Sequence, residues 1–510
     1  MGPSDTAPTP SGNPLDHLPD RTPDGLPDRP PDRLPDGGPL PPADRIEALD
    51  RVVIVGAGPV GMCTALTLAR LGVPVTVLEK GPGLSAESRA STFHPPTLEL
   101  LADLGVADEV IARGLKAPTT QFRDRALGPI AEFDLGVLAG DTEFPFRIQL
   151  EQNKLAELVL ATLEAEAALG ELDAEVRFGW RAHAVISHSG TAQGNGTLDT
   201  ALDGSSDRSS DTGLGGVSDV RLLVGTAEEL VEVRAPWVIA CDGAHSPVRE
   251  SLGLELVGET YPERFLVASV DEEIKDHLPV LAHVNYIADP DEWMVLLRTP
   301  DHWRVLFPVT EARADADRTD RATTNLAAAD PATTDPLTTN LAAADRVPAD
   351  GKQGFTEADV QARLTGVVDL GRPWKVLQWS LYVVSRRVAA RMRIDRVLLA
   401  GDAGHQNSPL GGMGMNSGIQ DGVSAARRLA AVWHGEADES VLDEYDENRR
   451  RVATEYVQAD SHANWLALRE PDPVKRAELQ ADLRATAADP ERHRARVERS
   501  AMIDATRAAL

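Results

Sequence analysis

The sequence predicts an α/β fold, α+β overall, made of a Rossmann-type domain, an antiparallel sheet domain and a helical C-terminus. Residues 51–80 indicate the Rossmann-type part, because an apolar strand, a glycine-rich turn, a helix and a second strand follow one another there. Residues 255–309 indicate the sheet domain, because apolar and polar residues alternate and aromatic residues recur. Residues 440–510 read as a series of helices.

The turn between the first strand and the first helix has glycines at the spacing G-x-G-x-x-G. Gly56 allows the tight turn, Gly58 lets a pyrophosphate approach the backbone, and Gly61 lets the helix pack close to the strand. The start of the helix presents free N–H groups and its positive dipole end to the phosphates. Glu79 ends the second strand, where it can accept hydrogen bonds from ribose hydroxyls. This unit predicts a dinucleotide site, and taken alone it allows either NAD or FAD.

Composition and charge exclude several classes of partner. The chain has 510 residues and a net charge of −29, which argues against binding to nucleic acid or to an anionic membrane surface. Its two cysteines, Cys63 and Cys241, provide no disulfide framework and fit a reducing cytoplasm. A secretory signal, a membrane-spanning apolar run and a metal-ligand constellation are not found in the sequence, so we expect a cytoplasmic protein with no metal.

Composition also divides the chain into domains. Residues 1–48 are rich in Pro and Asp and predict a disordered tail. Residues 188–219 predict a flexible insertion, and residues 311–350 a second, low-complexity one with a repeated TTNLAAAD unit. The other ranges are assigned to the dinucleotide domain (49–120, 147–254 and 375–435), the sheet domain (121–146 and 255–374) and the C-terminal helices (436–510).

A second glycine-rich segment follows a buried strand near residue 400. Gly401-Asp402 ends that strand, and the loop from Pro409 to Asn416 precedes a helix that we expect from about Ser417. A carboxylate at a strand end can bind a polyol hydroxyl, and the N–H groups of such a loop can stabilise an electron-rich edge. A simple NAD dehydrogenase has no use for this second site. The segment therefore favours FAD, whose reduced flavin ring is anionic.

Three motifs in order carry a family resemblance. They are GAGPVG with Glu79, CDGAHSPVR at 241–249, and GDAGHQNSPLGGMGMNSG at 401–418. Over about residues 50–435 the chain resembles the single-component FAD-dependent aromatic hydroxylases of the p-hydroxybenzoate hydroxylase type. It differs from that pattern at Gly404, where alanine is usual, and it lacks the thioredoxin-like C-terminal domain of the phenol hydroxylase branch.

The resemblance implies which residues hold the cofactor. Arg89 matches an arginine near the FAD pyrophosphate, Gln149 a glutamine on the FAD side chain, and Asp402 the acid on the ribitol. The middle motif serves both FAD and the pyridine nucleotide, which implies roles for Asp242 as well as for His245 and Arg249. The full set for FAD is Gly56, Gly58, Gly61, Glu79, Lys80, Arg89, Gln149, Asp242, Asp402, Gly412, Met415 and Asn416.

The resemblance also implies a chemistry. NADH or NADPH reduces FAD, O₂ adds to give a flavin C4a-hydroperoxide, and the terminal oxygen attacks an aromatic or heteroaromatic small molecule. The protein supplies orientation, electrostatics and a dry pocket, and Pro409 is expected near the reacting edge. Such an enzyme fits bacterial secondary metabolism or aromatic catabolism, with a small aromatic substrate and O₂ as partners and a homodimer as the candidate assembly.

The substrate side gives weaker signals. Arg298 can pair with a substrate carboxylate, although an arginine at this kind of position is more often solvated or salt-bridged. Alternation places Arg298 on the opposite sheet face from Val295 and Leu297. His94 is a candidate base or simply the residue that enters a helix before two prolines. The candidates on the sheet are His283, Tyr286, Trp293, Arg298, Trp303 and Arg304.

Other functions are compatible with the same motifs. One is a flavin-dependent epoxidase or oxidase of the same fold, a second is a flavin-dependent reductase, and a third is a non-catalytic dinucleotide-binding protein. The colour of the purified protein and substrate-stimulated NAD(P)H oxidation with O₂ uptake would distinguish them.

Overall fold

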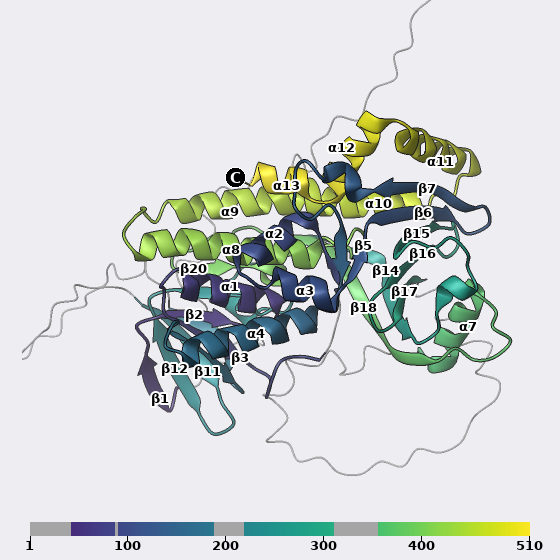
Figure 1. Ribbon diagram of the computed structural model, residues 1–510. Helices are drawn as coiled ribbons and strands as arrows, with labels where there is room; N and C mark the ends of the chain where they lie inside the picture. The colour runs from purple at the N-terminus through teal and green to yellow at the C-terminus, as the bar shows by residue number, and fades with distance from the viewer. Residues whose placement is uncertain (1–41, 87–89, 188–218, 311–354, 510) are drawn as a thin grey trace, which may run out of the picture.

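The computed structural model describes residues 42–86, 90–187, 219–310 and 355–509. Two parts lie side by side: helices stacked over strands, and a large sheet, with the last helices running along one side of both (Figure 1). Residues 1–41 of the predicted tail, residues 188–218 of the first predicted insertion and the whole of the second (311–350) fall outside the described residues.

A six-stranded sheet forms the centre of the dinucleotide domain, in the order β19-β20-β13-β2-β3-β9. Its strands pair in parallel except β19, which is antiparallel to β20. Every residue of β2 is at most 4% exposed, as its uninterrupted apolar sequence predicts. The strands are β2 (Val52–Val55), β3 (Val75–Glu79), β9 (Ala174–Phe178), β13 (Val238–Ala240), β19 (Arg393–Ile394) and β20 (Val397–Leu399).

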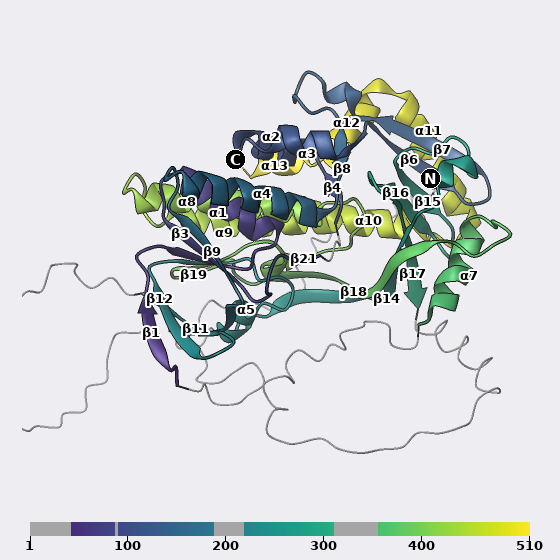
Figure 2. The ribbon, with the colours of Figure 1, turned by 60° about the horizontal axis from the view of Figure 1, so that its bottom comes forward.

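Helices lie along one side of this sheet (Figure 2). Helix α1 (Pro59–Arg70) contacts both α4 (Gln152–Ala168) and α8 (Gly414–Trp433). Helix α8 begins at Gly414, earlier than the predicted start near Ser417, because its first turn includes the end of the glycine-rich loop. The short helix α5 (Pro247–Ser251) follows the middle motif.

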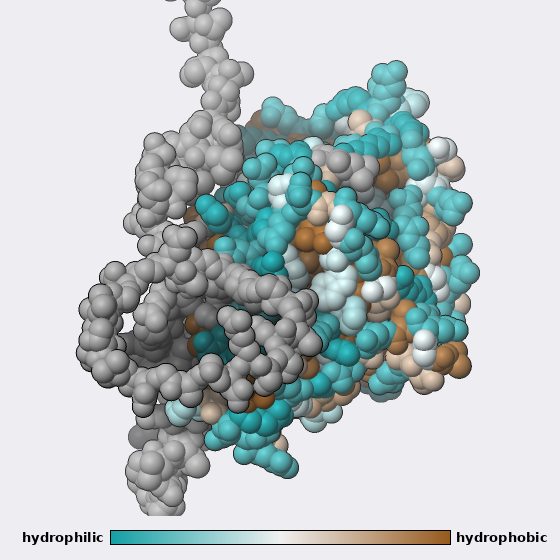
Figure 3. All heavy atoms as spheres, turned by 90° about the vertical axis from the view of Figure 1, so that its left-hand side faces the viewer, coloured by the Kyte–Doolittle hydropathy of each residue, from teal (hydrophilic) through white to brown (hydrophobic). Residues whose placement is uncertain are grey.

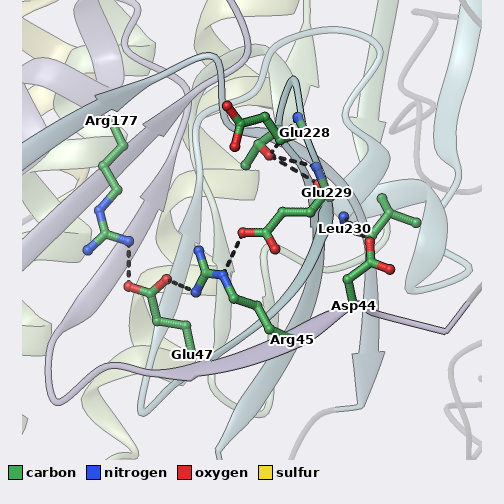
Figure 4. Close-up of polar contacts among 8 residues, drawn as sticks. Asp44, Arg45, Glu47, Arg177, Glu228, Glu229 and Leu230 are labelled. Atoms are coloured by element: carbon green, nitrogen blue, oxygen red, sulfur yellow. Dashed lines mark hydrogen bonds and ion pairs between the residues drawn. The ribbon is translucent and has the colours of Figure 1, made fainter.

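A four-stranded sheet in the order β1-β12-β11-β10 contains a strand that the sequence did not predict. Strand β1 (Arg45–Ala48) pairs in parallel with β12 (Leu230–Ala235), so the predicted tail is wrong for residues 45–48. Arg45 forms ion pairs with Glu47 and Glu229, and Glu47 pairs with Arg177 of β9 (Figure 4). The charges that made this segment look like tail thus have partners on neighbouring strands. The other strands are β10 (Arg181–Ser187) and β11 (Val220–Gly225).

The end of the molecule where this sheet lies is shown in Figure 3. Hydrophilic residues dominate its described part, and hydrophobic residues occur there in small groups (Figure 3). The ion pairs of β1 belong to this polar surface, since the side chains of Arg45 and Glu229 are 41% and 34% exposed.

An eight-stranded sheet forms the second part, in the order β21-β18-β14-β17-β16-β15-β6-β7. Its neighbouring strands are antiparallel, except that β15 and β6 are parallel. The predicted boundary at residue 375 is wrong, because β18 pairs with β14 along most of its length and belongs to this sheet. The strands are β6 (Thr119–Asp124), β7 (Gly128–Asp134), β14 (Leu256–Val270), β15 (Val284–Ala288), β16 (Met294–Arg298), β17 (Trp303–Thr310), β18 (Val376–Ala389) and β21 (His405–Gln406).

The two faces of this sheet bury different clusters. The outer face packs against helix α7 (Glu357–Val367) through residues such as Leu296 and Phe307. The inner sheet face is defined here by Phe265, Val267, Tyr286, Val295 and Leu306, and it packs against Leu410 of the second glycine-rich segment. The inner sheet face therefore looks toward the dinucleotide domain.

The remaining elements join these parts. A three-stranded sheet, β4-β8-β5, lies between them, and helices α11 and α12 contact β7, while α13 contacts α2 and α9. No helix of the described ranges is long and apolar enough to cross a membrane. These elements are β4 (Thr92–Phe93), α2 (Pro95–Asp103), α3 (Ala107–Arg113), β5 (Leu115–Ala117), β8 (Arg147–Gln149), α9 (Val441–Val452), a π-helix (Ala453–Gln458), α10 (Ala459–Leu468), α11 (Pro473–Ala488), α12 (Pro490–Ser500), α13 (Ile503–Ala508) and 3₁₀ turns at Leu135–Leu138, Ile274–Asp276 and Gly401–Ala403.

Candidate functional site

The first glycine-rich turn is packed too tightly for side chains at two of its three glycines. A Cβ on Gly61 would lie 1.9 Å from the carbonyl oxygen of Gly56, and a Cβ on Gly56 would lie 2.5 Å from the carbonyl oxygen of Cys241. Gly56 also has a φ of +101°. A Cβ on Gly58 would meet no protein atom within 4 Å. Gly58 therefore has free space above its backbone, where a phosphate group can approach.

Glu79 lies beside this turn, as predicted. Its Oε2 accepts a hydrogen bond from the backbone N–H of Ala57 at 2.8 Å, and its Oε1 accepts one from the N–H of Gly81 at 2.9 Å. These bonds fix the carboxylate next to the start of α1. Lys80 follows it and is exposed, and Arg89 lies outside the described residues.

The second glycine-rich segment meets the first. Gly401 has a φ of +62°, and a Cβ there would lie 3.1 Å from a methyl group of Val60 in the first turn of α1. A Cβ on Gly418 would lie 2.8 Å from Val60 and 3.0 Å from the Cα of Gly401. The N-terminal ends of α1 and α8 thus come together, although their glycine segments are far apart in sequence. Asp402 lies exposed at this junction.

Asp242, at the end of β13, carries an orphaned carboxylate oxygen. Its Oδ1 is buried and has no hydrogen-bond partner among the described residues, while Oδ2 accepts a bond from the N–H of Val248 at 3.3 Å. Burial raises the pKa of Asp242 to about 6, and hydrogen bonds from Ser246 and Val248 oppose that rise. An acceptor of this kind suits the hydroxyl groups of a ribityl chain.

Asn416 ties the loop before α8 to strand β4. Its Oδ1 accepts the backbone N–H of His94 at 2.9 Å, and its Nδ2 donates to the carbonyls of Thr92 and Gly412, both at 2.7 Å. Its side chain is therefore used within the protein, which leaves its backbone for a ligand. Gln149 lies nearby: its Oε1 accepts from the Thr92 hydroxyl at 3.0 Å, and its buried Nε2 has no partner among the described residues.

His94 holds the carbonyl of Gly411 in this loop. Its Nε2 lies 3.0 Å from that oxygen and must donate, because a carbonyl oxygen only accepts. Burial, and then the charge of Arg147, lower the pKa of His94 well below its ordinary value, so the ring is neutral. Its Nδ1 is buried, deprotonated and without a hydrogen-bond partner among the described residues. His94 also immediately precedes helix α2, which agrees with the expectation that it enters a helix before two prolines.

Tyr286 connects the inner sheet face to the same loop. Its hydroxyl oxygen accepts a hydrogen bond from the N–H of Gly411 at 2.9 Å, and its ring stacks on Phe122 with centroids 5.3 Å apart. Leu410, one residue after Pro409, packs into the inner sheet face. The segment from Pro409 to Gly411 is therefore held between His94 on one side and the sheet on the other.

Arg147 is a site residue that the sequence reasoning missed. Its side chain is 2% exposed, donates to the Thr120 hydroxyl at 2.8 Å and to the carbonyl of Ser500 at 2.9 Å, and leaves Nε without a partner among the described residues. Its charge lowers the pKa of Tyr286, against the rise caused by burial. Arg147 stands two residues before Gln149 in strand β8, whose three residues are all buried, and no local signal in the sequence marks that burial.

Other predicted residues lie away from this centre. Arg298 forms an ion pair with Glu273 at 3.1 Å, on the sheet face opposite Val295, so the structure does not bring it to the site. Arg304, two residues before Leu306, lies on the inner sheet face and is 4% exposed. Trp293 packs in the inner cluster, Trp303 packs in the outer one, and Nδ1 of His283 bonds the carbonyl of Lys116.

The two residues expected to serve the pyridine nucleotide differ in exposure. His245 is exposed. Arg249 is 5% exposed, donates to the carbonyls of Ala244 and Ala403, and pairs with Glu250 at 3.0 Å. Arg249 thus links the middle motif to the second glycine segment.

A buried polar network supports the second glycine segment from behind. Asp421 of α8 accepts hydrogen bonds from His405 at 2.8 Å, from the N–H of Gly401 at 3.1 Å and from Arg449 of α9 at 2.5 Å. Arg449 also donates to the hydroxyl of Ser417 at 3.1 Å. All of these side chains are at most 2% exposed. The network joins helix α9 to the turn that begins at Gly401.

The site as a whole suits an extended dinucleotide. Helix N-termini and an open glycine can take the phosphates, Glu79 and Asp242 can accept from hydroxyl groups, and N–H groups of the second glycine-rich loop could stabilise an electron-rich ring. Within the described ranges, no group of three or more His, Cys, Asp or Glu side chains could hold a metal ion. The donors present therefore fit the FAD that the resemblance implies.

Comparisons with known proteins agree with this assignment. A family described as "FAD binding domain" matches residues 50–201 and 211–460. Para-nitrophenol 4-monooxygenase of Pseudomonas sp. (strain WBC-3) is 29% identical over 434 residues, which cover 84% of this chain and 90% of that protein. The crystal structure of p-nitrophenol 4-monooxygenase PnpA from Pseudomonas putida DLL-E4 matches with a TM-score of 0.69 and 28% identity, over 91% of this chain and 99% of that chain. The ternary complex of aklavinone-11 hydroxylase with FAD and aklavinone matches with a TM-score of 0.60 and 25% identity. The match covers 83% of this chain and 69% of that chain.

Proposed function

The chain belongs to the FAD binding domain family and is an FAD-dependent aromatic monooxygenase, and we propose that its substrate is a small aromatic molecule bearing an anionic oxygen substituent. The reaction converts a ring C–H, O₂, NAD(P)H and a proton into C–OH, water and NAD(P)⁺. When bound, FAD would supply the redox chemistry that couples NAD(P)H oxidation to the entry of one oxygen atom of O₂ into the ring.

Arg147 is the observation that carries this proposal. It is a buried guanidinium with a free Nε and hydrogen bonds only to neutral oxygens among the described residues. A buried charge without a counter-charge is costly, and an anionic ligand would remove that cost. Burial raises the pKa of Tyr286, and Arg147 stands close enough for its charge to oppose that rise. Because its oxygen accepts from Gly411 N–H, its own proton is free to be donated to a ligand oxygen.

The length of the relatives supports a small substrate. The chain spans nearly the whole of the p-nitrophenol 4-monooxygenases and about two thirds of the aklavinone hydroxylase. The aromatic and aliphatic side chains of the inner sheet face, closed by Leu410, would keep water from the reacting ring. Neutral His94 would fix Pro409–Gly411 at the edge of that ring without supplying a charge.

For the cofactor we propose contacts along the whole site. The first glycine turn and Glu79 would hold the adenosine half, and Asp242 and Asp402 would hold hydroxyls of the ribityl chain. We propose that His245, which is exposed, contacts NADH or NADPH, and that Arg249 acts indirectly. The other proposed FAD contacts are Lys80, Arg89, Gln149, Gly412, Met415 and Asn416.

Location and assembly are further proposals. The two cysteines are free, which fits a cytoplasmic enzyme, and cell fractionation would test this. A homodimer would be tested by light scattering of the purified protein.

Arg147→Gln is the experiment that tests the proposed substrate. Purified wild-type protein should be yellow, and 4-nitrophenol or 4-hydroxybenzoate should stimulate NAD(P)H and O₂ consumption with formation of a hydroxylated product. We expect Arg147→Gln to raise the KM for such substrates by roughly one to two orders of magnitude, because a hydrogen bond to a charged group contributes about 1.5–3 kcal/mol. FAD content should stay normal.

Arg298→Gln is the comparison for this test. If Arg298→Gln rather than Arg147→Gln raises the KM, or if neutral aromatics are turned over as well as anionic ones, the proposal is wrong. If no aromatic compound stimulates NAD(P)H oxidation, a reductase or a non-catalytic role would be favoured instead.

The raised pKa of Asp242 predicts a pH dependence of FAD binding. Below about pH 6 the free protein holds a proton on this carboxyl, whereas a carboxylate that accepts hydroxyl hydrogen bonds in the complex does not. Binding must then release the proton, so we expect FAD affinity to fall by up to about tenfold per pH unit below that pKa. Fluorescence titration of apoprotein between pH 7 and pH 5 would measure it. Asp242→Asn should bind less tightly and lose this dependence; an equal slope in the variant would contradict the assignment.

A further inference from the structure

The turn between the last two helices touches both sides of the site. The carbonyl of Ser500 accepts the hydrogen bond from Arg147, and the side chain of Met502 packs in one cluster with Met413 of the cofactor loop. Residues 500–502 connect α12 to α13 and lie more than 350 residues from Arg147 along the chain.

Met413 in turn lies against Gly411, which is hydrogen-bonded to Tyr286 and His94. The side chain of Met413 folds back on the loop, so that a Cβ on Gly411 would lie 2.7 Å from its terminal methyl group. The N–H of Gly411 donates to Tyr286 and its carbonyl accepts from His94. Met502 therefore packs in the same cluster as the side chain that folds back on Gly411.

The backbone conformation of Met502 indicates that its side chain is needed there. It has a φ of +66° and a ψ of 15°, a left-handed conformation that glycine adopts most easily at a helix end. Three non-glycine residues of the described ranges have positive φ, and of these Met502 alone is buried, at 1% exposure. Such residues persist where the surroundings fix them, and they concentrate at functional sites.

We propose that the turn Ser500–Met502 is a positioning element that holds Arg147 and the loop at Gly411 in register with each other. In the monooxygenase reaction it would keep the substrate ring aligned with the flavin edge, so that NAD(P)H oxidation stays coupled to hydroxylation of the substrate. The part that concerns Arg147 rests on the proposed function; the part that concerns the loop does not. When alignment fails, NAD(P)H, O₂ and a proton give NAD(P)⁺ and H₂O₂ without a hydroxylated product.

Met502→Gly tests this inference, because glycine keeps the left-handed turn and removes the side chain that packs in the cluster with Met413. We expect normal FAD content and a fraction of NAD(P)H recovered as H₂O₂ that is at least about threefold higher than in the wild type, since small displacements of reacting groups cost large factors in rate. Met502→Leu should return this fraction most of the way to the wild-type value. The fraction is measured as H₂O₂ and hydroxylated product per NAD(P)H consumed.

Val497→Ala is the matched control. Val497 lies on α12, is 1% exposed, and packs with residues of β7 and the following turn rather than with Met413. It should lower the melting temperature and leave the H₂O₂ fraction unchanged. An unchanged fraction in Met502→Gly, or an equal rise in Val497→Ala, would overturn the inference. If the proposal of an anionic aromatic substrate is wrong, a different result would show it: the Arg147→Gln variant would have a wild-type KM.

Discussion

Gly61→Ala should abolish FAD binding and destabilise the apoprotein by about 3 kcal/mol or more, the upper range for overpacking a closed site. The added Cβ would lie 1.9 Å from the carbonyl oxygen of Gly56 and 3.3 Å from the Cβ of Cys241. The carbonyl of Gly56 is part of the backbone and cannot move aside as the end of a flexible side chain can. Helix α1 would have to shift, and α8 with it, because the two helices pack on each other. Urea unfolding of apoprotein and flavin content after purification would measure both effects.

Gly58→Ala is the control that separates an effect on the stability of the fold from an effect on FAD binding. Its Cβ would meet no protein atom within 4 Å, and its φ of −70° and ψ of 178° suit alanine. The apoprotein should keep its stability, while FAD affinity should fall by roughly ten- to a hundredfold, because the methyl group occupies the space of the pyrophosphate. Equal FAD affinity in Gly58→Ala and wild type would show that the phosphates do not approach this turn.

Asp421→Ala should be the second severe change. It would leave Arg449 buried without its counter-charge and remove the acceptor for His405 and for Gly401 N–H. Removing one partner of a buried ion pair costs about 3–5 kcal/mol. Burial alone would raise the pKa of Asp421. The charge of Arg449 and the hydrogen bonds from His405 and Arg449 outweigh that effect, so the pKa is lowered from its ordinary value. The stabilisation is therefore complete at neutral pH and is lost as the pH falls through that lowered pKa.

Arg427→Ala, on the same helix, is the comparison for Asp421→Ala. Arg427 pairs with Asp103 at the surface, with side chains 49% and 64% exposed, so its loss should cost less than about 1 kcal/mol. Thermal unfolding at pH 7 and flavin content would be measured for both variants. Similar stabilities of the two variants would mean that the buried network does not support the Gly401 turn.

The sequence was sufficient for the parts of the fold that repeat a local pattern. The glycine spacing, the apolar strand and Glu79 predicted the first turn, and the structure confirms its geometry. Strand β1 was missed because its signal is not local: Arg45 and Glu47 look like tail until their partners, Glu229 just before β12 and Arg177 of β9, are known. The boundary at residue 375 failed for the same reason, since only the pairing of β18 with β14 assigns it to the second sheet.

The candidate site shows the same division. Alternation correctly separated Arg298 from Val295, and the ion pair with Glu273 explains why Arg298 does not reach the inner sheet face. Arg147 could not be chosen from the sequence, because its position depends on Thr120 and Ser500, which come from β6 and the end of α12. A lone arginine becomes informative only when its burial is known.

The convergence of the two glycine segments has a consequence for biosynthesis. Gly56 and Gly401 are 345 residues apart, and the sheet between them needs β13 and β20 to be complete. At ordinary rates of translation the ribosome takes roughly 20–70 s to make that length of chain. Once Glu79 has been made, the nascent chain still lacks β13, β20 and the second glycine segment. A cofactor that needs both glycine segments therefore joins after synthesis of α8, and the edge of β13 that pairs with β20 stays open until β20 is made.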